Sequence, residues 1–399
     1  MEFDEISADT KATILLTTRL GEMWNDQKPL SPAEFRSVQN WLIERGLTVG
    51  DLVTGNHQAS VKAMIGDGVG STLILSMSER IPKLMQAVAR WVEAGIWVTG
   101  ETDSTFPERL RHRLGAAGFP LIFGAGQLEF LNSGGVYIVG SRNSSKSGLQ
   151  FSRSLAKRCG EEGITVISSD MRGADREAMG ATEGCVVCVL SDSLEKAVAT
   201  KRHREQLEQG NLVIVTPFSP DTRFRVANAI RVNRYQYCLA DFAVIVETRR
   251  SGGVWLGAEE NRKENWVPAF VRAEEDVPMG NEALLSLGYM SLSEREILGC
   301  DNIGEYLISR LTSRYGPQPL EAIPCAPLNA VGRKLFDGFC KELVSFVDSA
   351  ARSSEEIQYH FEIEPGQAEA WITRALEEGV LMKTGDADRY CIRRNISSY

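Results

Sequence analysis

A glycine, small polar residues and several basic residues follow an apolar segment in VYIVGSRNSSKSGLQFSRSLAKR, residues 136–158. An apolar strand, a glycine turn and a helix in this order are typical of loops that bind phosphate through the backbone amides of a helix N-terminus. The spacing differs from the G-x-G-x-x-G of dinucleotide-binding turns. The pattern is compatible with a dinucleotide, a small phosphorylated ligand or a nucleic-acid backbone. The stretch holds no acid, and its basic residues are Arg142, Lys146, Arg153, Lys157 and Arg158.

Three further loops follow apolar segments and carry similar residues. Carboxyl ends of parallel strands meet at one edge of a sheet, so we expect the four loops to converge on one crevice. The planar guanidinium of arginine is suited to hydrogen bonds with phosphate oxygens, and paired glycines allow the backbone to approach a ligand closely. Together the loops predict a site for a polyanion that carries sugars. The residues are Ser168, Arg172, Gly173 and Asp175 in 168–178, Arg223, Arg225, Asn228, Arg231, Asn233 and Arg234 in 223–241, and Gly252 and Gly253 in 247–260.

The middle of the chain alternates short apolar runs with helix-compatible stretches. Runs rich in β-branched residues, each followed by a polar or helical segment, predict a parallel sheet covered on both faces. We therefore expect an α/β fold with a Rossmann-like, doubly wound parallel sheet over residues 101–293, in which 101–134 form a lead-in segment. The predicted strands are GVYIV, ITVIS, CVVCVL, LVIVT, FAVIVE and VPAFV.

The two ends of the chain have different patterns. Residues 1–100 predict an N-terminal helical domain, in which Ser31, Pro32 and Glu34 form a helix start with a capping box. Residues 294–350 predict a linker with helices, since 313–332 carry four prolines. Residues 351–399 predict two helices and a hairpin turning at 385–386, the layout of a winged helix. The second helix carries Arg374 among several glutamates, so this domain is interpreted as a packing or protein-interaction module.

Composition limits the possible functions. The net charge of −9 at pH 7 argues against a protein that coats nucleic acid indiscriminately, although a local basic groove remains compatible with it. Apolar runs are shorter than the ~20 residues that span a bilayer, and the acidic N-terminus is unlike a secretory signal. We expect a cytoplasmic protein without membrane association. Cys185 and Cys188 have C-x-x-C spacing but no second ligand pair, so we interpret them as buried strand residues and expect neither metal nor cofactor.

Five motifs, in order, give the chain a family resemblance. They are TFPERL, VYIVGSRNSSKSG, VISSDMRGADREAM, RVNRYQYCLAD and SGGVWLGA, and they cover roughly residues 104–290. As a set they resemble the DNA-processing protein A (Smf) family. The resemblance implies a helical domain, a Rossmann-like domain that binds single-stranded DNA, and a C-terminal winged helix. It also implies a homodimeric recombination mediator without catalytic residues, which protects single strands and loads a RecA-type recombinase, notably in transformation.

The resemblance assigns the site residue by residue. It also shows departures: Ser169 stands where the family has glycine, Met179 where it has histidine, and Val232 where it has the first arginine of R-N-R. These mark a divergent member, for which a role in transformation, repair or defence stays open. The family pattern is matched by Gly140, Ser141, Arg142, Ser145, Gly148, Ser168, Gly173, Asp175, Ala178, Asn233, Arg234, Leu239, Asp241, Gly252 and Ala258, and we add Lys146, Arg172, Asn228 and Gly253 as expected DNA or phosphate contacts.

Two alternatives use the same crevice. Nucleotide phosphoribohydrolases carry G-G-x-G-T-x-x-E, of which this chain keeps two glycines and Glu259 but has Trp255 and Leu256 in place of Gly-Thr. A nucleotide-sensing module is the other alternative. If single-stranded DNA binds, aromatic side chains should stack on its bases. Tyr235, Tyr237 and Trp255 are the candidates for this role, with burial in the core as the competing interpretation.

Overall fold

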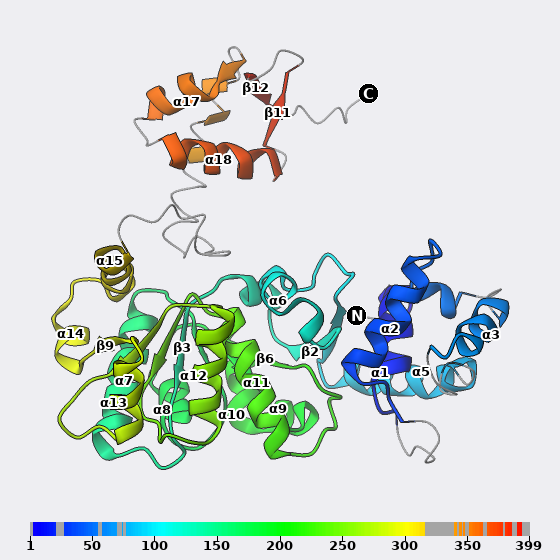
Figure 1. Cartoon of the computed structure of the whole chain (residues 1–399), viewed down its shortest axis with the longest axis horizontal. Helices are drawn as coiled ribbons and strands as arrows, with labels where there is room; N and C mark the ends of the chain where they lie inside the picture. The colour runs from blue at the N-terminus through cyan, green and yellow to red at the C-terminus, as the bar shows by residue number, and fades with distance from the viewer. Residues whose placement is uncertain are drawn as a thin grey trace. The chain divides into compact units, whose positions relative to one another are not determined.

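The structure of this chain, a computed structural model, divides into two compact units whose boundary lies within residues 317–327 (Figure 1). Each unit is described by itself. The described residues are 3–20, 28–54, 58–69, 74, 77–315, 339–340, 343–344, 346–347, 351–361, 365–377, 380–384 and 389–392.

A nine-stranded sheet forms the centre of the first unit. Its strand order is β1-β2-β6-β5-β4-β3-β7-β8-β9. The strands from β6 to β9 in this order are all parallel, whereas β2 pairs antiparallel with both of its neighbours, β1 and β6. The bounds are β1 Trp97–Gly100, β2 Leu121–Ala125, β3 Val136–Val139, β4 Val166–Ser168, β5 Val186–Val189, β6 Leu212–Thr216, β7 Phe242–Ile245, β8 Ala269–Arg272 and β9 Met290–Leu292.

The strand order reverses direction between β3 and β7. From β3 the chain adds β4, β5 and β6 on one side and then returns to place β7 on the other side. In open α/β sheets a ligand crevice lies beyond the carboxyl ends of the strands at such a switch point. The 136–158 stretch and the loop after β7 therefore lie side by side at the position where the fold favours a ligand.

The six strands predicted from sequence are confirmed as β3 to β8. The sequence did not reveal β1, β2 and β9. Two of these are short and contain glycine, WVTG and LIFGA, and glycine weakens a strand pattern. Part of the expected lead-in segment thus belongs to the sheet, because β2 pairs with β6.

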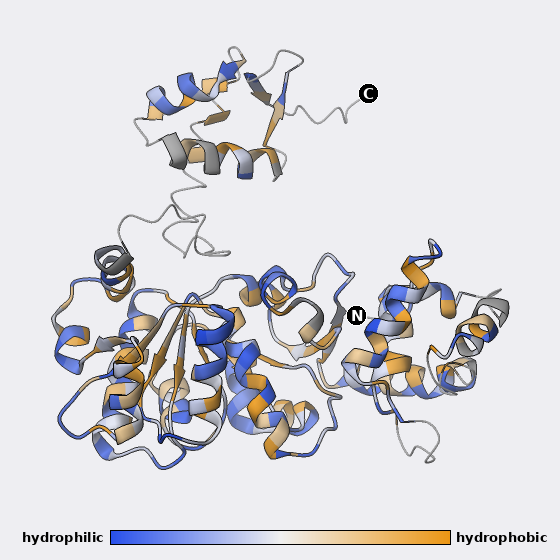
Figure 2. Ribbon diagram, viewed as in Figure 1, coloured by the Kyte–Doolittle hydropathy of each residue, from blue (hydrophilic) through white to orange (hydrophobic). Residues whose placement is uncertain are grey.

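Both faces of the sheet are covered by helices. In β5, Val186 and Cys188 join one apolar cluster, and Val187 and Val189 join another. Met179 of helix α8 lies in the first cluster and Val232 of helix α11 lies in the second. Figure 2 shows the central strands as strongly hydrophobic and the helices as mixed. The expected doubly wound α/β architecture is therefore present, and the central strands β3 to β6 are buried on two sides.

The N-terminal helices pack on this same unit. Ser31 caps α2 with Pro32 in the first turn and with reciprocal hydrogen bonds to Glu34, as the sequence predicts. The cluster that contains Leu15, Trp41 and Trp91 continues into β2, β5 and β6. The described elements of this region are η1 Phe3–Glu5, α1 Ala8–Thr17, α2 Pro32–Ile43, η2 Gly50–Leu52, α3 Gln58–Gly66 and α5 Met77–Glu93.

Two helices of the expected linker dock on the sheet unit. The Arg158 side chain of α7 donates to the carbonyl of Cys300, and the Glu162 carboxylate accepts from the backbone amide of Ile303. The proline-rich part of that linker, from residue 316, lies outside the described residues. The helices of this part of the chain are α6 Glu108–Leu114, η3 Gly115–Ala117, η4 Leu128–Asn132, α7 Lys146–Glu161, α8 Ala174–Ala181, α9 Leu194–Ala199, α10 Lys201–Glu208, α11 Val226–Leu239, α12 Gly253–Glu264, α13 Met279–Ser286, α14 Glu294–Gly299 and α15 Ile303–Tyr315.

The second unit has a small antiparallel sheet of order β10-β12-β11. Its elements are β10 Arg352–Ser353, α17 Ser354–Phe361, α18 Pro365–Glu377, β11 Leu381–Lys383 and β12 Arg389–Ile392. The predicted helix pair and hairpin are confirmed, although the turn at 385–386 lies outside the described residues. Ile357, Ile372 and Leu381 share one apolar core. No helix in the described parts of either unit is long and apolar enough to cross a membrane.

Candidate nucleic-acid interface

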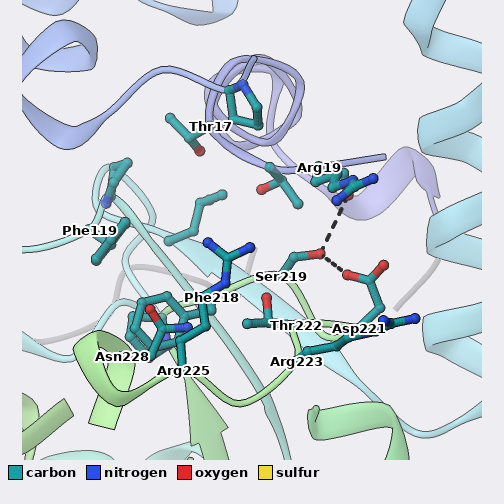
Figure 3. A pocket seen from close by; sticks show the side chains of 15 residues that line it. Thr17, Arg19, Phe119, Phe218, Ser219, Asp221, Thr222, Arg223, Arg225 and Asn228 are labelled. Atoms are coloured by element: carbon teal, nitrogen blue, oxygen red, sulfur yellow. Dashed lines mark hydrogen bonds between the residues drawn. The ribbon is translucent and has the colours of Figure 1, made fainter. Parts of the chain in front are cut away.

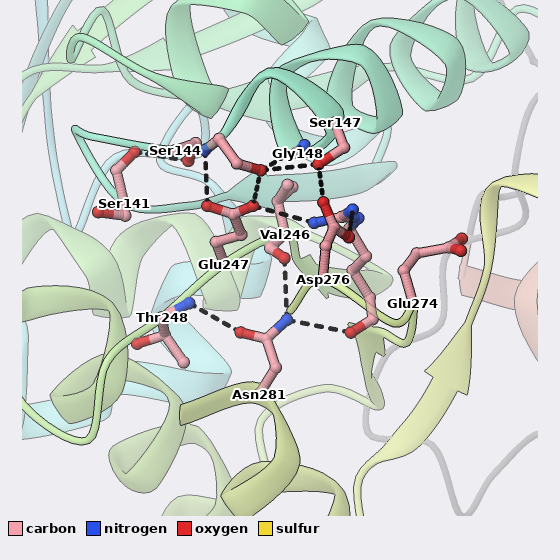
Figure 4. Close-up of polar contacts among 12 residues, drawn as sticks. Ser141, Ser144, Ser147, Gly148, Val246, Glu247, Thr248, Glu274, Asp276 and Asn281 are labelled. Carbon is pink, nitrogen blue, oxygen red and sulfur yellow. Dashed lines mark hydrogen bonds and ion pairs between the residues drawn. The ribbon is translucent and has the colours of Figure 1, made fainter. Parts of the chain in front are cut away.

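A buried carboxylate fills the helix N-terminus at the switch point. Helix α7 begins after Ser145, whose hydroxyl accepts from the amide of Gly148. The Glu247 carboxylate, from the loop after β7, accepts from the Ser145 amide at 2.9 Å and from the Ser145 hydroxyl (Figure 4). The carbonyl of the same glutamate accepts from the Ser141 amide. A side chain of the protein thus occupies the place where a bound phosphate would meet this helix.

Arg272 neutralises this carboxylate. Its guanidinium lies 2.9 Å from Glu247, and both side chains are almost fully buried. Arg272 also contacts the half-exposed Asp276, which accepts from Ser147 of α7. The hydrogen bond from Ser147, with Arg272 nearby, lowers the pKa of Asp276. Asn281 completes the network by bonding the loop after β7 and the end of β8. The loop for which the sequence predicted phosphate binding is therefore bonded to a network of charged and polar side chains of the protein itself.

Sequence reasoning missed Glu247 because an acid after a strand looks like an ordinary surface residue. Gly148, which was expected to contact phosphate, is buried, and a side chain at this position would overlap the Glu247 carboxylate. Ser145 uses its amide and its hydroxyl on the same carboxylate. The expected phosphate contacts of Ser145 and Gly148 would require Glu247 to move.

Asp175 joins the loops after β3 and β4. This side chain is only 4% exposed. It accepts from the Gly140 amide at 3.2 Å and from the Ser169 hydroxyl at 2.6 Å. Gly173 precedes it with φ of +103°, and a side chain at Gly173 would overlap the Ser141 carbonyl. Ser168 is fully buried and bonds the carbonyl of Ile138, so its expected contact with DNA is corrected to a role in aligning β4 with β3.

Burial of Asp175 predicts a measurable pH dependence. Desolvation raises its pKa to about 6, against 3.8 in the unfolded chain. The folded state then binds the proton more tightly, so this stabilisation is complete below pH 3.8 and is lost as the pH rises through 6. Between pH 4.5 and pH 7.5, the free energy of unfolding of Asp175→Asn should therefore rise by about 2 kcal/mol relative to that of the wild type, at about 1.36 kcal/mol per pKa unit. Urea unfolding of both proteins at the two pH values measures this gain, and an unchanged difference would contradict it.

The basic face of α7 is largely neutralised. Acids close to it in space pair with three of the five cations that the sequence groups in 136–158: Arg153 with Glu177 at 2.6 Å, Lys157 with Glu161 at 3.7 Å and Arg158 with Glu162 at 3.0 Å. Of the five basic residues in 136–158, Arg142 and Lys146 remain without an ion pair among the described residues.

Cations without ion pairs gather instead at the carboxyl edge of the sheet. The loops after β3, β4, β6 and β7 each contribute at least one, and these four strands run parallel. All of them are exposed, and none lies within 4 Å of an acid in the part of the chain that the structure describes. We call this set the basic rim. It consists of Arg142, Lys146, Arg172, Arg223, Arg225, Arg249 and Arg250.

Asn233 and Arg234 connect two helices beside the rim. The Asn233 amide donates to the carbonyl of Gly253 at 2.8 Å, and Arg234 pairs with Glu260 at 2.6 Å. Both bonds join α11 to α12. Gly252 precedes α12 with φ of +91° and is exposed, so this backbone turn is open to a ligand. The prediction that these residues contact DNA stays a prediction.

The exposed aromatic side chain of the rim is Phe224. It is 43% exposed, and the Arg142 guanidinium lies 5.4 Å from its ring centre. Tyr235 and Tyr237, proposed as stacking platforms, are each 1% exposed and belong to the core. Trp255 is half-buried against the same core cluster. The signal that could have revealed Phe224 is its position between Arg223 and Arg225, an aromatic residue flanked by cations.

Metal ligands do not cluster in this arrangement. Among the residues that the structure describes, no group of three or more His, Cys, Asp or Glu side chains could hold a metal ion. Cys188 is a fully buried thiol of β5, and Cys185 is a half-buried thiol just before it. Burial raises the pKa of both thiols, to about 11 for Cys185, which agrees with the interpretation of this pair as apolar strand residues.

Solved structures with similarity to this chain include two DNA processing proteins. DNA processing protein A from Streptococcus pneumoniae has 18% sequence identity and a TM-score of 0.52, over 75% of this chain and 98% of that one. DNA processing protein A from Helicobacter pylori, described for its single-stranded DNA binding mode, has 19% identity and a TM-score of 0.44, over 55% of this chain and 96% of that one. The molybdenum cofactor binding protein from Rippkaea orientalis has 13% identity and a TM-score of 0.31, over 44% and 96%. At 18% identity, the similarity to the Streptococcus pneumoniae protein is one of fold.

The family of the chain is shown by a match in sequence to a protein family. No curated protein matches the chain significantly in sequence. Residues 97–294, which contain the nine-stranded sheet and the basic rim, match the family described as DNA recombination-mediator protein A. The motifs around Gly140, Asp175, Asn233 and Gly252 all lie within this span. The chain therefore belongs to the DNA recombination-mediator protein A family.

Proposed function

We propose that this protein binds single-stranded DNA along the basic rim and acts as a recombination mediator without catalytic turnover. The proposal rests on the basic rim. Its cations come from four separate loops, have no ion pairs among the described residues and lie at one edge of the sheet, although the whole chain has a net charge of −9. A cluster of like charges left unneutralised on an acidic protein is the electrostatic footprint of a polyanion ligand. Family membership supports the same ligand class.

The geometry favours an extended strand over a single phosphate. The helix N-terminus at the switch point is filled by Glu247, so the cations around it, rather than the amides of α7, would contact phosphates. Phe224 offers a ring face beside Arg142 on which a base can stack. Base stacking combined with backbone neutralisation gives binding with little sequence preference, as a protein that protects strands of any sequence requires.

Fluorescence anisotropy of labelled oligo-dT across a salt series tests the proposal. Each phosphate contact contributes about −0.7 to the slope of log K against log salt for single strands. We expect steep salt dependence for the wild type and a slope reduced by about 0.7 for Arg142→Ala. Arg204→Ala, which changes an exposed arginine of α10 outside the rim, is the control and should leave the slope unchanged. Absence of binding at low salt would refute the proposal.

The finer parts of the function are supported by family membership alone. A RecA-type recombinase would be the protein partner, and the working form would be a homodimer. The C-terminal helices α17 and α18 with the β11–β12 hairpin would serve as a winged helix. Its second helix carries Arg374 among glutamates, so contact with the recombinase is a better role for it than contact with DNA. Crosslinking of the full chain to recombinase, with and without DNA, would reveal such contact.

A further inference from the structure

A pocket of about 690 Å³ opens where the end of α1 meets the loop after β6. It is lined by the end of the first helix, by the segment before β2 and by the segment between β6 and α11 (Figure 3). Its volume lies within the range of about 300–1,000 Å³ that is typical of small-molecule sites. The pocket is separate from the Glu247 network, which lies on β7 and α7.

Positive charge surrounds this pocket. Figure 3 shows Arg19 on the side of α1, and Arg223 and Arg225 on the side of the loop before α11. The one acid among the lining residues, Asp221, accepts from the Ser219 hydroxyl at 2.6 Å. Arg225 is also the N-cap residue of the 14-residue helix α11, and its side chain makes no capping bond. A helix N-terminus without a side-chain cap adds donor amides and a partial positive charge, both of which favour an anion.

Two polar residues of the pocket wall are largely buried and turn unbonded polar atoms toward the pocket, as far as the described residues show. Thr18 is 3% exposed and Asn228 is 7% exposed, and both line the pocket. Neither the Thr18 hydroxyl nor the Asn228 amide makes a hydrogen bond to any residue that the structure describes. Their polar atoms are open to the pocket and are not enclosed, so water can bond them until a ligand displaces it. These two are in place to bond a ligand that enters the pocket.

Another part of the wall is apolar and aromatic. Phe119 and Phe218 form an edge-to-face pair with ring centres 5.4 Å apart, and Pro120 and Pro217 flank them. Such a surface suits a planar ring, while the arginines and the α11 N-terminus suit a phosphate. A side-chain amide both donates and accepts, as recognition of a base edge requires.

We propose that this pocket binds a nucleoside phosphate, with the phosphate against Arg223 and Arg225 and the base near Asn228 and the phenylalanine pair. The same chemistry has two sources, a free mononucleotide and the phosphorylated end of a DNA strand. The inference does not require that the basic rim binds DNA. Because the pocket shares Arg223 and Arg225 with the rim, an occupant would reduce the charge available to a bound strand.

Isothermal titration of the full chain with AMP, GMP, CMP, dTMP and inorganic phosphate tests the pocket. We expect at least one nucleotide to bind at least tenfold more tightly than inorganic phosphate. Thr18→Val, which removes a hydroxyl at nearly constant shape, and Asn228→Asp, which places a negative charge in the wall, should each weaken that binding at least tenfold. Arg249→Ala, in the rim but outside the pocket, is the matched control and should change it less than twofold.

A second arm separates the two sources and the two sites. If a strand end is the ligand, 5′-phosphorylated linear oligo-dT should displace the bound nucleotide at least tenfold better than circular oligo-dT of equal length. If a free nucleotide is the ligand, both should compete equally. Circular oligo-dT alone, measured by anisotropy, reports on the rim. Undetectable nucleotide binding, phosphate binding as tight as nucleotide binding, or unchanged affinity in a properly folded Asn228→Asp would each overturn the pocket proposal, whatever the rim binds.

Discussion

Arg272→Met should destabilise the sheet unit by about 3–5 kcal/mol, the largest stability effect that we expect from a single substitution in this chain. The Arg272 side chain is 2% exposed and the Glu247 side chain is 3% exposed. Removal of the guanidinium would leave the carboxylate buried beside β3 and β7 without its counter-ion. The remaining bonds, from the amide and hydroxyl of Ser145, would not supply the missing charge.

The measurement is thermal unfolding, accompanied by hydrogen exchange of the β3 and β7 amides. For a unit of this size the expected loss lowers the melting temperature by roughly 10 °C, and the exchange identifies which part of the chain opens. Glu247→Gln combined with Arg272→Met removes both charges and should recover most of the loss, because a neutral buried pair carries no desolvation penalty for charge. Recovery distinguishes an uncompensated charge from a packing defect.

Arg234→Met is the matched control for this experiment. Arg234 also pairs with a glutamate, at 2.6 Å, but its side chain is 28% exposed and that of Glu260 is 30% exposed. Half-exposed pairs contribute about 1 kcal/mol or less. A loss in Arg234→Met as large as that in Arg272→Met would contradict the view that burial at the switch point determines the cost.

Features of the fold that depend on local sequence could be predicted. The six strands from β3 to β8 were predictable because each is a short β-branched run bounded by turn residues, a local property. The capping box of Ser31 and Glu34 was predictable for the same reason, since its partners are three residues apart. The convergence of four loops on one edge followed from the parallel strand order, which the alternation of strands and helices implies.

The state of several charges was not predictable, because their partners are distant in sequence. Arg153 and Glu177 are 24 residues apart, Arg272 and Glu247 are 25 apart, and Arg234 and Glu260 are 26 apart. Their meeting depends on the packing of whole helices and strands. The sequence left two interpretations of Tyr235 and Tyr237 open, stacking on bases or burial in the core, and the packing of α11 buries both. The sequence therefore predicts that the loops meet at the carboxyl edge of the sheet, whereas the packing of helices and strands determines which of their side chains are exposed there.

The largest effect on DNA binding is expected from the removal of unpaired cations of the basic rim. Simultaneous Arg142→Ala, Arg172→Ala and Arg249→Ala removes three rim cations from three different loops, all outside the pocket beside α11. If each contacts one phosphate, the slope of log K against log salt should fall by about 2, and affinity at 0.1 M salt should fall about a hundredfold through lost counterion release. Anisotropy of labelled oligo-dT between 50 and 300 mM salt measures both quantities.

A second triple variant separates the rim from overall charge. Arg153→Ala, Arg176→Ala and Arg310→Ala change the net charge equally, but these arginines already pair with Glu177, Asp170 and Glu296. Since their charges are compensated inside the protein, we expect less than a threefold loss of affinity and an unchanged slope. Equal losses in the two triples would mean that DNA responds to total charge and not to the rim. A hundredfold loss confined to the rim variant would place the phosphates at the carboxyl edge of the sheet, where packing leaves the arginines unneutralised.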